Sequence, residues 1–114
     1  MVMERGDIWW ASLPIPVGTM LGYRRPVLIV QADSFNQSAI HTALAVILTS
    51  NLRLAEAPGN ILCLRKHTGL PKDSVANISQ VVTVDKTMLT EKLGELSLPL
   101  MRQIEAGLRL ILAL

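Results

Sequence analysis

Two consecutive arginines, Arg24 and Arg25, stand directly before a proline and a short apolar run. The residue that precedes a proline is pushed out of the α region toward extended backbone, so Arg25 is expected to enter a strand. The run from Val27 to Val30 is β-branched or aliphatic throughout, which is typical of a strand buried on both faces. The two guanidinium groups are therefore predicted to lie at the rim of a rigid sheet, where their positions are fixed.

Length and composition indicate one small domain with part of its apolar surface outside the core. The 114 residues allow a single core, half of them are hydrophobic, and the mean hydropathy is +0.39. A chain this small cannot bury all of that surface alone, so we expect an interface between subunits. The net charge of +2 and the pI of about 9.0 are mildly basic, which is compatible with nucleic acid but is weak evidence for it.

Cysteine usage and the N-terminus indicate the compartment. Cys63 is the only cysteine, so neither an intramolecular disulfide nor a cysteine zinc site can form. The N-terminus lacks the apolar core of a signal peptide, and no apolar run approaches the length of a membrane span. We therefore expect a reduced, soluble, cytoplasmic protein that does not associate with a membrane.

The remaining pattern predicts several strands closed by one helix. Turn residues bound further strands at residues 6–14, 43–50, 61–64, 75–84 and 93–96. The strand after the arginine pair is expected to end near Ala32 and Asp33, with Asp33 or Ser34 capping a single helical turn. Ser97 is expected to cap a last helix that has Pro99 in its first turn. Its apolar residues at helical spacing are Leu100, Met101, Ile104, Leu108, Ile111 and Leu112.

These elements predict an α+β domain over residues 1–114. It consists of a strongly bent antiparallel sheet of five to seven strands, arranged as a small barrel, with short helices and a C-terminal helix. Trp9 and Trp10 must point to opposite faces of the first strand because side chains alternate along a strand. One tryptophan is expected in the core and the other in a groove or an interface.

The arginine pair precedes one predicted strand, and hydroxyl and amide side chains end the next strand, at residues 43–50. They are Thr49, Ser50 and Asn51. If the two strands are antiparallel, the start of one lies beside the end of the other. A guanidinium fork would then lie near hydroxyl and amide donors, a combination suited to binding a phosphate. A surface arginine pair beside an ordinary strand end fits the same spacing, so the spacing alone leaves both readings open.

Other acid–base groups are sparse. His41 and His67 lie in or beside predicted loops, and a catalytic histidine pair would need both in one pocket. The aspartates occupy turn or cap positions, and no spacing resembles a metal cluster, so no metal or other cofactor is expected. Cys63 lies in a strand pattern without a neighbouring histidine, which favours packing over nucleophilic catalysis.

Five short segments resemble the MazF/PemK toxins in order and spacing over essentially the whole chain. They are Arg5-Gly6-Asp7-Ile8-Trp9-Trp10, Arg25-Pro26-Val27-Leu28-Ile29-Val30-Gln31, Leu48-Thr49-Ser50-Asn51, Leu70-Pro71-Lys72-Asp73-Ser74-Val75, and Gln80 with Thr83-Val84-Asp85-Lys86. The resemblance implies an SH3-like barrel with added helices that works as a homodimer and cuts single-stranded RNA, including mRNA, at a short sequence. It also implies a cognate antitoxin whose flexible segment covers the RNA groove.

Carried over residue by residue, the resemblance gives Arg25 and Thr49 as the catalytic pair. It gives Thr19, Gln80, Ser50 and Asn51 as residues that shape the RNA site. Two departures from the family pattern affect this site. The family usually has Ser-Glu-Gln where this chain has Thr19-Met20-Leu21, which lacks the acid, and Gln-Ile-Arg-Thr where this chain has Gln80-Val81-Val82-Thr83, which lacks the cation at Val82. These changes are expected to alter the RNA sequence that is cut or to weaken RNA binding.

Further RNA-binding residues follow from the residue types present. Arg24 could replace part of the charge lost at Val82. Bases are expected to stack on the few aromatic side chains, with Tyr23, Trp10 and Trp9 as candidates. A position in the core or in the dimer interface is at least as plausible for the two tryptophans.

The family resemblance implies a metal-independent reaction. The neighbouring 2′-hydroxyl attacks the phosphate and leaves a 2′,3′-cyclic phosphate and a 5′-hydroxyl. A guanidinium, whose ordinary pKa lies far above neutral pH, would cost roughly 7 kcal/mol to deprotonate there. Arg25 is therefore expected to stabilise charge on the phosphate, and Thr49 to bond a phosphate oxygen. The general base stays open between His41, His67 and water.

Two functions of other classes remain as alternatives. A gyrase-poisoning toxin on the same barrel would bind its target and cut nothing. That class uses an aromatic residue in its C-terminal tail, whereas this chain ends Leu110-Ile111-Leu112-Ala113-Leu114. The other alternative is an SH3-like interaction module, because a fold by itself does not determine a function.

Overall fold

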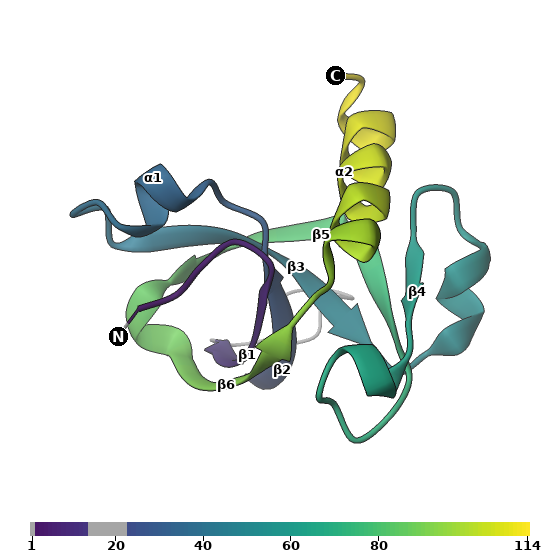
Figure 1. The fold of residues 1–114 in the computed structure, drawn as a ribbon, viewed down its shortest axis with the longest axis horizontal. Helices are drawn as coiled ribbons and strands as arrows, with labels where there is room; N and C mark the ends of the chain where they lie inside the picture. Colours follow the sequence, from purple (N-terminus) through teal and green to yellow (C-terminus); the bar gives the residue numbers. More distant parts are fainter. Residues whose placement is uncertain (1, 14–22) are drawn as a thin grey trace.

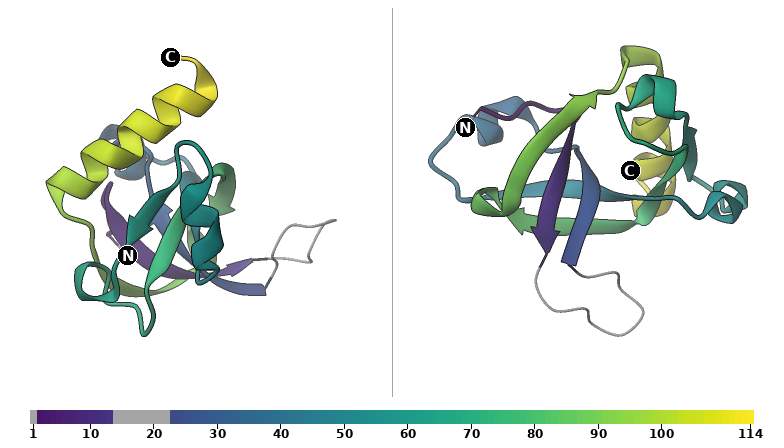
Figure 2. Two further views of the ribbon diagram at one scale, coloured as in Figure 1. Left: turned by 90° about the vertical axis from the view of Figure 1, so that its right-hand side faces the viewer. Right: turned by 90° about the horizontal axis from the view of Figure 1, so that it is seen from below.

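The computed structural model describes residues 2–13 and 23–114. Six strands form one antiparallel sheet in the order β4-β5-β3-β2-β1-β6, curled into an open barrel with α2 across one face (Figures 1 and 2). The strands are β1 (Asp7–Leu13), β2 (Tyr23–Ile29), β3 (Thr42–Thr49), β4 (Ile61–Cys63), β5 (Ser74–Asp85) and β6 (Leu89–Glu95). The helices are α1 (Asp33–Asn36) and α2 (Leu98–Leu112), with 3-10 turns η1 (Leu52–Glu56), η2 (Arg65–His67) and η3 (Lys86–Met88). The predicted α+β fold with a strongly bent sheet is confirmed.

The central strands are apolar on both faces because a separate hydrophobic cluster covers each face. On β2, Leu28 belongs to one cluster, whereas Val27 and Ile29 belong to the other. The outer cluster, beneath α2, contains Ile8, Leu28, Val46, Leu48, Cys63, Leu70, Ala76, Ile78, Leu96, Met101 and Ile104. The inner cluster, inside the curled strands, contains Met3, Trp9, Ala11, Val27, Ile29, Ala43, Ala45, Ile47, Val84 and Leu89. This arrangement explains the continuous apolar run in β2.

An irregularity in β5 separates the sheet into two parts. Val46 pairs with Val81, but Leu48, two residues further along β3, pairs with Ala76. The extra residues on β5 break the ladder, and such irregularities bend a strand and increase its twist. Beyond the bend, β5 also pairs with the short edge strand β4. The long strand thus belongs both to the barrel and to the part of the sheet beneath α2.

Helix α2 begins as predicted and packs against the sheet as far as Gly107 and Leu108. The Ser97 hydroxyl accepts a hydrogen bond from the backbone N–H of Leu100 at 3.4 Å, and Pro99 lies in the first turn. Met101 and Ile104 are buried in the outer cluster. Four large apolar side chains near the end of the chain are exposed: Leu110, Ile111, Leu112 and Leu114. The predicted apolar stripe therefore continues beyond the part that the barrel covers.

Two sequence predictions near α1 were wrong. Strand β2 ends at Ile29, not near Ala32, because the N–H groups of Val30 and Gln31 both donate to the Leu44 carbonyl as the chain turns away. Ala32 is the N-cap residue of α1, and no side chain caps this turn. Asp33 instead accepts hydrogen bonds from the backbone N–H of Arg5 at 2.7 Å and from the Asn36 amide at 3.1 Å. Its carboxylate therefore connects α1 to the N-terminal segment.

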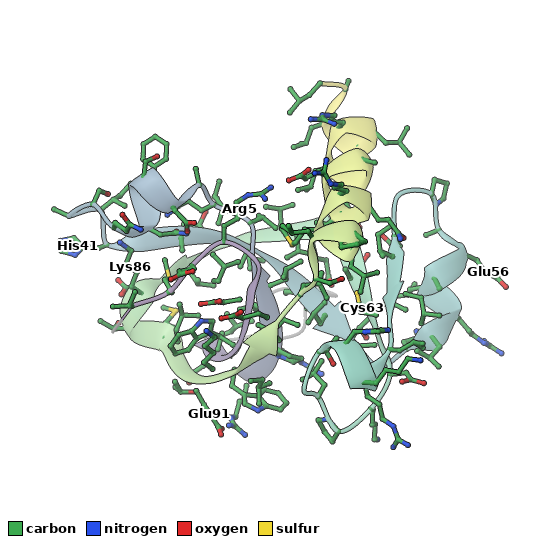
Figure 3. All side chains as sticks on the ribbon, viewed as in Figure 1. Arg5, His41, Glu56, Cys63, Lys86 and Glu91 are labelled. Carbon is green, nitrogen blue, oxygen red and sulfur yellow. The ribbon has the colours of Figure 1, made fainter. Side chains whose placement is uncertain are left out.

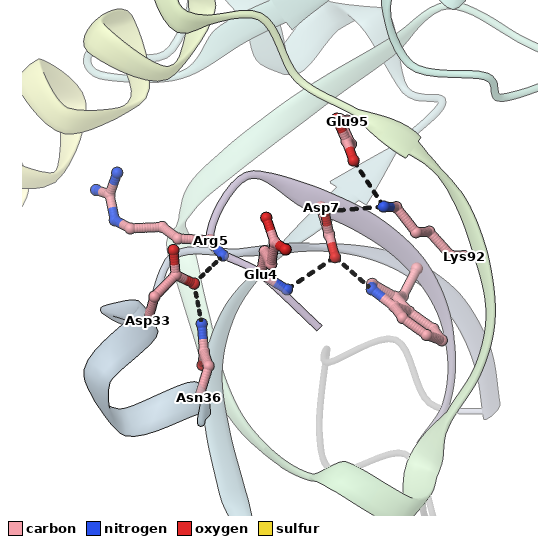
Figure 4. A network of polar contacts seen from close by, with 8 residues as sticks. Glu4, Arg5, Asp7, Asp33, Asn36, Lys92 and Glu95 are labelled. Carbon is pink, nitrogen blue, oxygen red and sulfur yellow. Dashed lines mark hydrogen bonds and ion pairs between the residues drawn. The ribbon is translucent and has the colours of Figure 1, made fainter. Parts of the chain in front are cut away.

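Strand β6 is longer than predicted and is held by a polar network (Figure 4). The buried Asp7 carboxylate accepts hydrogen bonds from the Glu4 backbone N–H at 2.8 Å and from Trp9 Nε1 at 3.3 Å. Its other oxygen lies 3.4 Å from Lys92 Nζ, which also pairs with Glu95 at 2.7 Å. These partners raise the pKa of Lys92, with the hydrogen bond to Glu95 as the largest cause. The network joins β1 to the edge strand.

Candidate functional site

The register of β2 and β3 brings the arginine pair to the end of β3. The two strands are antiparallel with Val27 opposite Ile47, which confirms the orientation on which the sequence argument depended. Continued by two residues, this register places Arg25 level with Thr49. Because Val27 and Ile47 share a face, the alternation also directs Arg25 and Thr49 to one face. The strand end thus brings the two predicted catalytic residues to the same level of the sheet.

A pocket of about 250 Å³ opens beside this strand end. Its lining consists of Trp10, Arg24, Arg25, Pro26, Leu48, Ser50, Leu70, Pro71, Lys72 and Ser74. Three of these side chains are cationic, and none of the lining residues is acidic. An open pocket lined by one sign of charge attracts ligands of the opposite sign, so this pocket is suited to an anion.

Arg25 is the least satisfied polar side chain at this site. It is half-buried, and it makes no ion pair within the described part of the chain, whereas Arg5 pairs with Glu105 and Arg24 with Glu91. Over residues 2–13 and 23–114, Arg25 Nε is the only buried side-chain nitrogen or oxygen without a hydrogen-bond partner. Leaving a buried donor unpaired costs about 1–3 kcal/mol, more for a charged group. A phosphate oxygen would satisfy this donor.

Thr49 is held by the turn that ends β3. Its side chain is buried, and its Oγ1 accepts a hydrogen bond from the Asn51 backbone N–H at 3.2 Å, which leaves the hydroxyl proton free to donate elsewhere. Asn51 Oδ1 accepts from the Arg53 backbone N–H at 3.3 Å and caps η1. Ser50 is exposed and lines the pocket, whereas Thr49 and Asn51 do not. The turn therefore fixes the direction of the Thr49 hydroxyl.

The two tryptophans lie on opposite faces of β1, as predicted. Trp9 is buried in the inner cluster, and Trp10 lines the pocket. The Arg24 guanidinium carbon lies 4.4 Å from the centroid of the Trp10 ring. Arg24 also pairs with Glu91 at 3.3 Å. Trp10 is thus the tryptophan of the groove, and Trp9 that of the core.

Gln80 does not line this pocket. It lies on β5, where its side-chain oxygen Oε1 accepts a hydrogen bond from the Asn77 side-chain amide at 2.9 Å. Asn77 in turn bonds Asn60, so Gln80 belongs to a polar network beside η1. Tyr23 begins β2, with its backbone opposite Leu13. Thr19 and Met20 lie outside the described residues. The departure from the family pattern at these two positions therefore lies outside them as well. Val82 is half-buried against the inner cluster.

One wall of the pocket was not among the predicted site residues. Leu70, Pro71, Lys72 and Ser74 come from the loop between η2 and β5. The Asp73 carboxylate accepts a hydrogen bond from the Arg65 backbone N–H at 2.8 Å and fixes this loop. The segment that begins Leu70-Pro71-Lys72 is one of those that resemble the toxin family, and this was the signal that could have identified Lys72 as a site residue.

The two histidines lie in different pockets and are not brought together as a catalytic pair would require. His41 lies beside Lys86 near α1 (Figure 3) and lines a pocket there, whereas His67 lines another pocket with Leu62 and Ser97. Neither histidine lines the pocket that contains Arg25. Burial raises the pKa of the Cys63 thiol to about 11, in line with the packing role predicted for it.

The described residues contain neither a group of metal ligands nor a membrane-spanning helix. Between residues 2–13 and 23–114, no three histidine, cysteine or acidic side chains are grouped closely enough to hold a metal ion. No helix in the same ranges is both long and apolar enough to span a bilayer.

Comparisons with known proteins agree with the sequence resemblance. Residues 4–112 match the model of the family described as PemK-like, MazF-like toxin of type II toxin–antitoxin system. The chain is 44% identical over 114 residues to endoribonuclease MazF6 of Mycobacterium tuberculosis, with both chains covered completely. The predicted class, a toxin endoribonuclease of this family, is confirmed by these two matches.

Solved structures show the same fold. The crystal structure of MazF from Deinococcus radiodurans superposes with a TM-score of 0.82 at 21% identity, covering 100% of this chain and 99% of that one. A mycobacterial endoribonuclease in complex with its cognate antitoxin gives a TM-score of 0.74 at 24% identity, covering 99% and 95% of the two chains. Together with the family match and the relative of equal length, this fold shows that the chain belongs to the PemK-like, MazF-like toxins of type II toxin–antitoxin systems.

Proposed function

We propose that this protein is a metal-independent, sequence-specific endoribonuclease that cuts single-stranded RNA, and mRNA in particular, in the cytoplasm. The observation that carries the proposal is the unpaired, buried Nε of Arg25 at the level of Thr49, beside a pocket with three cations. Membership of the toxin family supports the RNA substrate. Cutting messages would stop translation and growth, which accounts for a toxin.

In the proposed reaction, the 2′-hydroxyl of the nucleotide before the cut attacks the adjacent phosphorus. A bond from O2′ to phosphorus forms, and the bond from phosphorus to O5′ breaks. The O2′ proton passes to a base, and the departing O5′ receives a proton. The products are a 2′,3′-cyclic phosphate and a 5′-hydroxyl. Neither histidine of the same chain lines the pocket, which favours water among the bases left open by the sequence.

Arg25 and Thr49 have separate parts in this reaction. Negative charge grows on the phosphate oxygens as the fifth bond to phosphorus forms, and a guanidinium already fixed in a half-buried position stabilises that charge without reorganising. The Thr49 hydroxyl donates to one of the same oxygens and holds the phosphate in line for attack. Lys72 and Ser50, both in the lining, would bind neighbouring phosphates of the strand.

We further propose a homodimer and a cognate antitoxin. Exposed Leu110 on α2 belongs to an apolar face that the barrel does not cover, and Leu62 on the edge strand β4 is exposed as well. Pairing two copies through this face would bury it and double the positive charge available to RNA. One mycobacterial relative has been solved with its cognate antitoxin. For this chain, an antitoxin segment lying over the cationic pocket would block RNA.

The test is cleavage of a long single-stranded RNA in the presence of EDTA, with the ends mapped and their chemistry determined. Wild-type protein should cut at one short motif and leave 2′,3′-cyclic phosphate ends. Arg25→Ala should lose about 10³-fold or more in rate, because a preorganised donor of this kind contributes that much. Arg53→Ala removes an exposed arginine outside the pocket and is the matched control.

Three outcomes would contradict the proposal. Cleavage that requires a divalent metal would exclude the metal-independent reaction. A normal rate for Arg25→Ala would remove Arg25 from the mechanism. Intact RNA with folded wild-type protein would exclude the nuclease, and inhibition of gyrase would then be measured as the activity of the alternative toxin class.

A further inference from the structure

Arg24 is held in a planar stack whose members are set by the strand register. Trp10 pairs with Pro26 across β1 and β2, and Arg24 lies two residues from Pro26, so Trp10 and Arg24 are diagonal neighbours on one face. Glu91 of β6 lies opposite Trp10 on its other side. The three side chains therefore come from three adjacent strands and meet at the mouth of the cationic pocket.

The geometry of the stack leaves one planar surface free. The guanidinium carbon lies over the Trp10 ring, 4.4 Å from its centroid, so the indole covers one side of the guanidinium. The ion pair with Glu91 uses Nη2, an atom at the edge of the guanidinium plane. The Arg24 side chain is nonetheless 56% exposed. Its second face is therefore open to solvent and lies beside the pocket.

The charge of the stack distinguishes it from a phosphate site. Arg25 and Lys72 in the same pocket have no ion-pair partner within the described ranges, whereas Arg24 is already paired with a carboxylate. Glu91 offsets the charge of Arg24 and repels an approaching phosphate. A neutral, flat group meets no such penalty. Guanidinium planes and aromatic rings are the surfaces on which proteins stack unpaired RNA bases.

We propose that Trp10, Arg24 and Glu91 form a platform on which a nucleobase next to the scissile phosphate stacks. Trp10 packs against one side of the Arg24 guanidinium. Glu91 is a positioning residue, because its ion pair with Arg24 fixes the orientation of the guanidinium over the ring. This inference rests on the proposed ribonuclease function, because it places the base beside a phosphate at Arg25. The platform predicts that Arg24 contributes to RNA affinity by stacking and not through its charge.

The test uses the cleavage motif of the wild-type protein in a short single-stranded RNA with a 2′-deoxynucleotide at the cut, which removes the attacking hydroxyl. A series of these RNAs carries one abasic nucleotide at each position around the cut. Kd and its salt dependence are measured for wild type, Arg24→Lys, Arg24→Ala and Glu91→Ala. All the substituted residues are exposed, and thermal unfolding checks that each variant is folded. Arg53→Lys is the control, because Arg53 is exposed and lies outside the pocket.

Stacking predicts that Arg24→Lys, although it keeps the charge, weakens binding of intact RNA by roughly 5- to 100-fold. The slope of log Kd against log salt should not change. One abasic position should weaken wild-type binding by a similar factor and have no effect in Arg24→Lys. Glu91→Ala should also weaken binding, because the guanidinium is no longer held flat.

A phosphate contact predicts the opposite pattern. Arg24→Lys would then bind as wild type does, Arg24→Ala would lower the salt slope by about one, and Glu91→Ala would tighten binding by removing a repelling charge. Any of these results would overturn the platform and leave the ribonuclease proposal standing. Wild-type protein that neither cuts nor binds RNA would instead reject the proposed function itself.

Discussion

Arg25, near the start of β2, and Thr49, at the end of β3, have different hydrogen-bond environments. The buried Arg25 Nε has no partner over the described residues, whereas the Thr49 oxygen already accepts from the turn that follows it. An unpaired cation is suited to binding an anion, and a fixed hydroxyl is suited to orienting it. Substitutions at the two positions should therefore change different kinetic constants.

Thr49→Ala is expected to lower the rate of RNA cleavage by about 100-fold, at the lower end of the range for removing one donor to a developing charge. The affinity for RNA should change by less than about threefold, because most of the binding comes from cations that are unchanged. Single-turnover kinetics and equilibrium binding measure the two separately. Thr49→Ser should restore most of the rate. Equal losses of rate and affinity would instead make Thr49 a binding residue.

Cys63 provides a pH-dependent prediction. Burial raises the pKa of its thiol from 9.0 to about 11, so the folded state holds the proton more tightly than the unfolded state. The resulting stability is fully present below pH 9 and is lost as the pH rises from 9 toward 11. Cys63→Ser should remove this component of the loss, which is on the order of 2 kcal/mol. Urea unfolding at pH 8 and pH 10.5 measures it, and an identical loss in both proteins would contradict the assignment.

The residue-scale predictions from sequence were best where a residue is adjacent to a strand end. Arg25 and Thr49 could be placed together because an antiparallel register needs only two neighbouring strands. Lys72 could not be found this way, since it reaches the pocket from a loop distant in the chain and fixed by the Asp73 carboxylate. The position of Gln80 in the Asn77 network depends on the irregularity in β5, which the alternating pattern does not reveal.

At the scale of elements, helix α2 is held against the loop before β4 by two glycines. A Cβ at Gly107 would overlap the backbone carbonyl oxygen of Gly59. In an exposed helix, glycine to alanine usually stabilises by about 1 kcal/mol. At Gly107 the neighbouring atoms belong to the backbone and cannot shift without disturbing the fold. Alanine at this position is therefore expected to destabilise the protein and not to stabilise it.

Gly107→Ala is thus expected to destabilise the protein by about 1–3 kcal/mol, the usual cost of overpacking. Ala106→Gly, the neighbouring exposed position of the same helix, is the control and should cost about 1 kcal/mol from helix propensity alone. Thermal and urea unfolding measure both variants. A Gly107→Ala protein as stable as wild type would mean that α2 can shift away from the loop.

Element boundaries were predictable where a local signal acts and wrong where a distant partner acts. The Ser97 cap of α2 and the Asp85 cap of η3 are local, and both are present. The same rule failed at Asp33, because its carboxylate is engaged by the Arg5 backbone from 28 residues earlier. Strand β6 starts earlier than its apolar residues suggest, since it pairs with β1 along a solvent-facing edge.

At the scale of the whole molecule, the end of α2 presents apolar side chains that no other part of the described chain covers. Leu110 is 63% exposed and Leu114 85% exposed. A second copy covering this surface would make the assembly depend on apolar contact rather than on charge. The high mean hydropathy of the sequence would then be explained by the interface of the dimer and not by the core of one monomer.

Leu110→Glu is accordingly expected to convert the dimer to a monomer while leaving the barrel folded. Light scattering measures the mass, and circular dichroism checks the fold. Glu56→Gln is the control, because Glu56 is exposed on η1 and a change of charge there leaves the apolar face intact. A Leu110→Glu protein that remains dimeric would place the interface elsewhere.

The outer cluster extends from Ile8, near the start of the chain, to Ile104 in the last helix, and it includes Leu48 and Leu70 of the candidate pocket. During synthesis this cluster cannot close until α2 has left the ribosome. A chain released early from a broken message lacks Met101 and Ile104 and cannot support the pocket walls. The candidate site is therefore expected to fold only after the last helix has been synthesised.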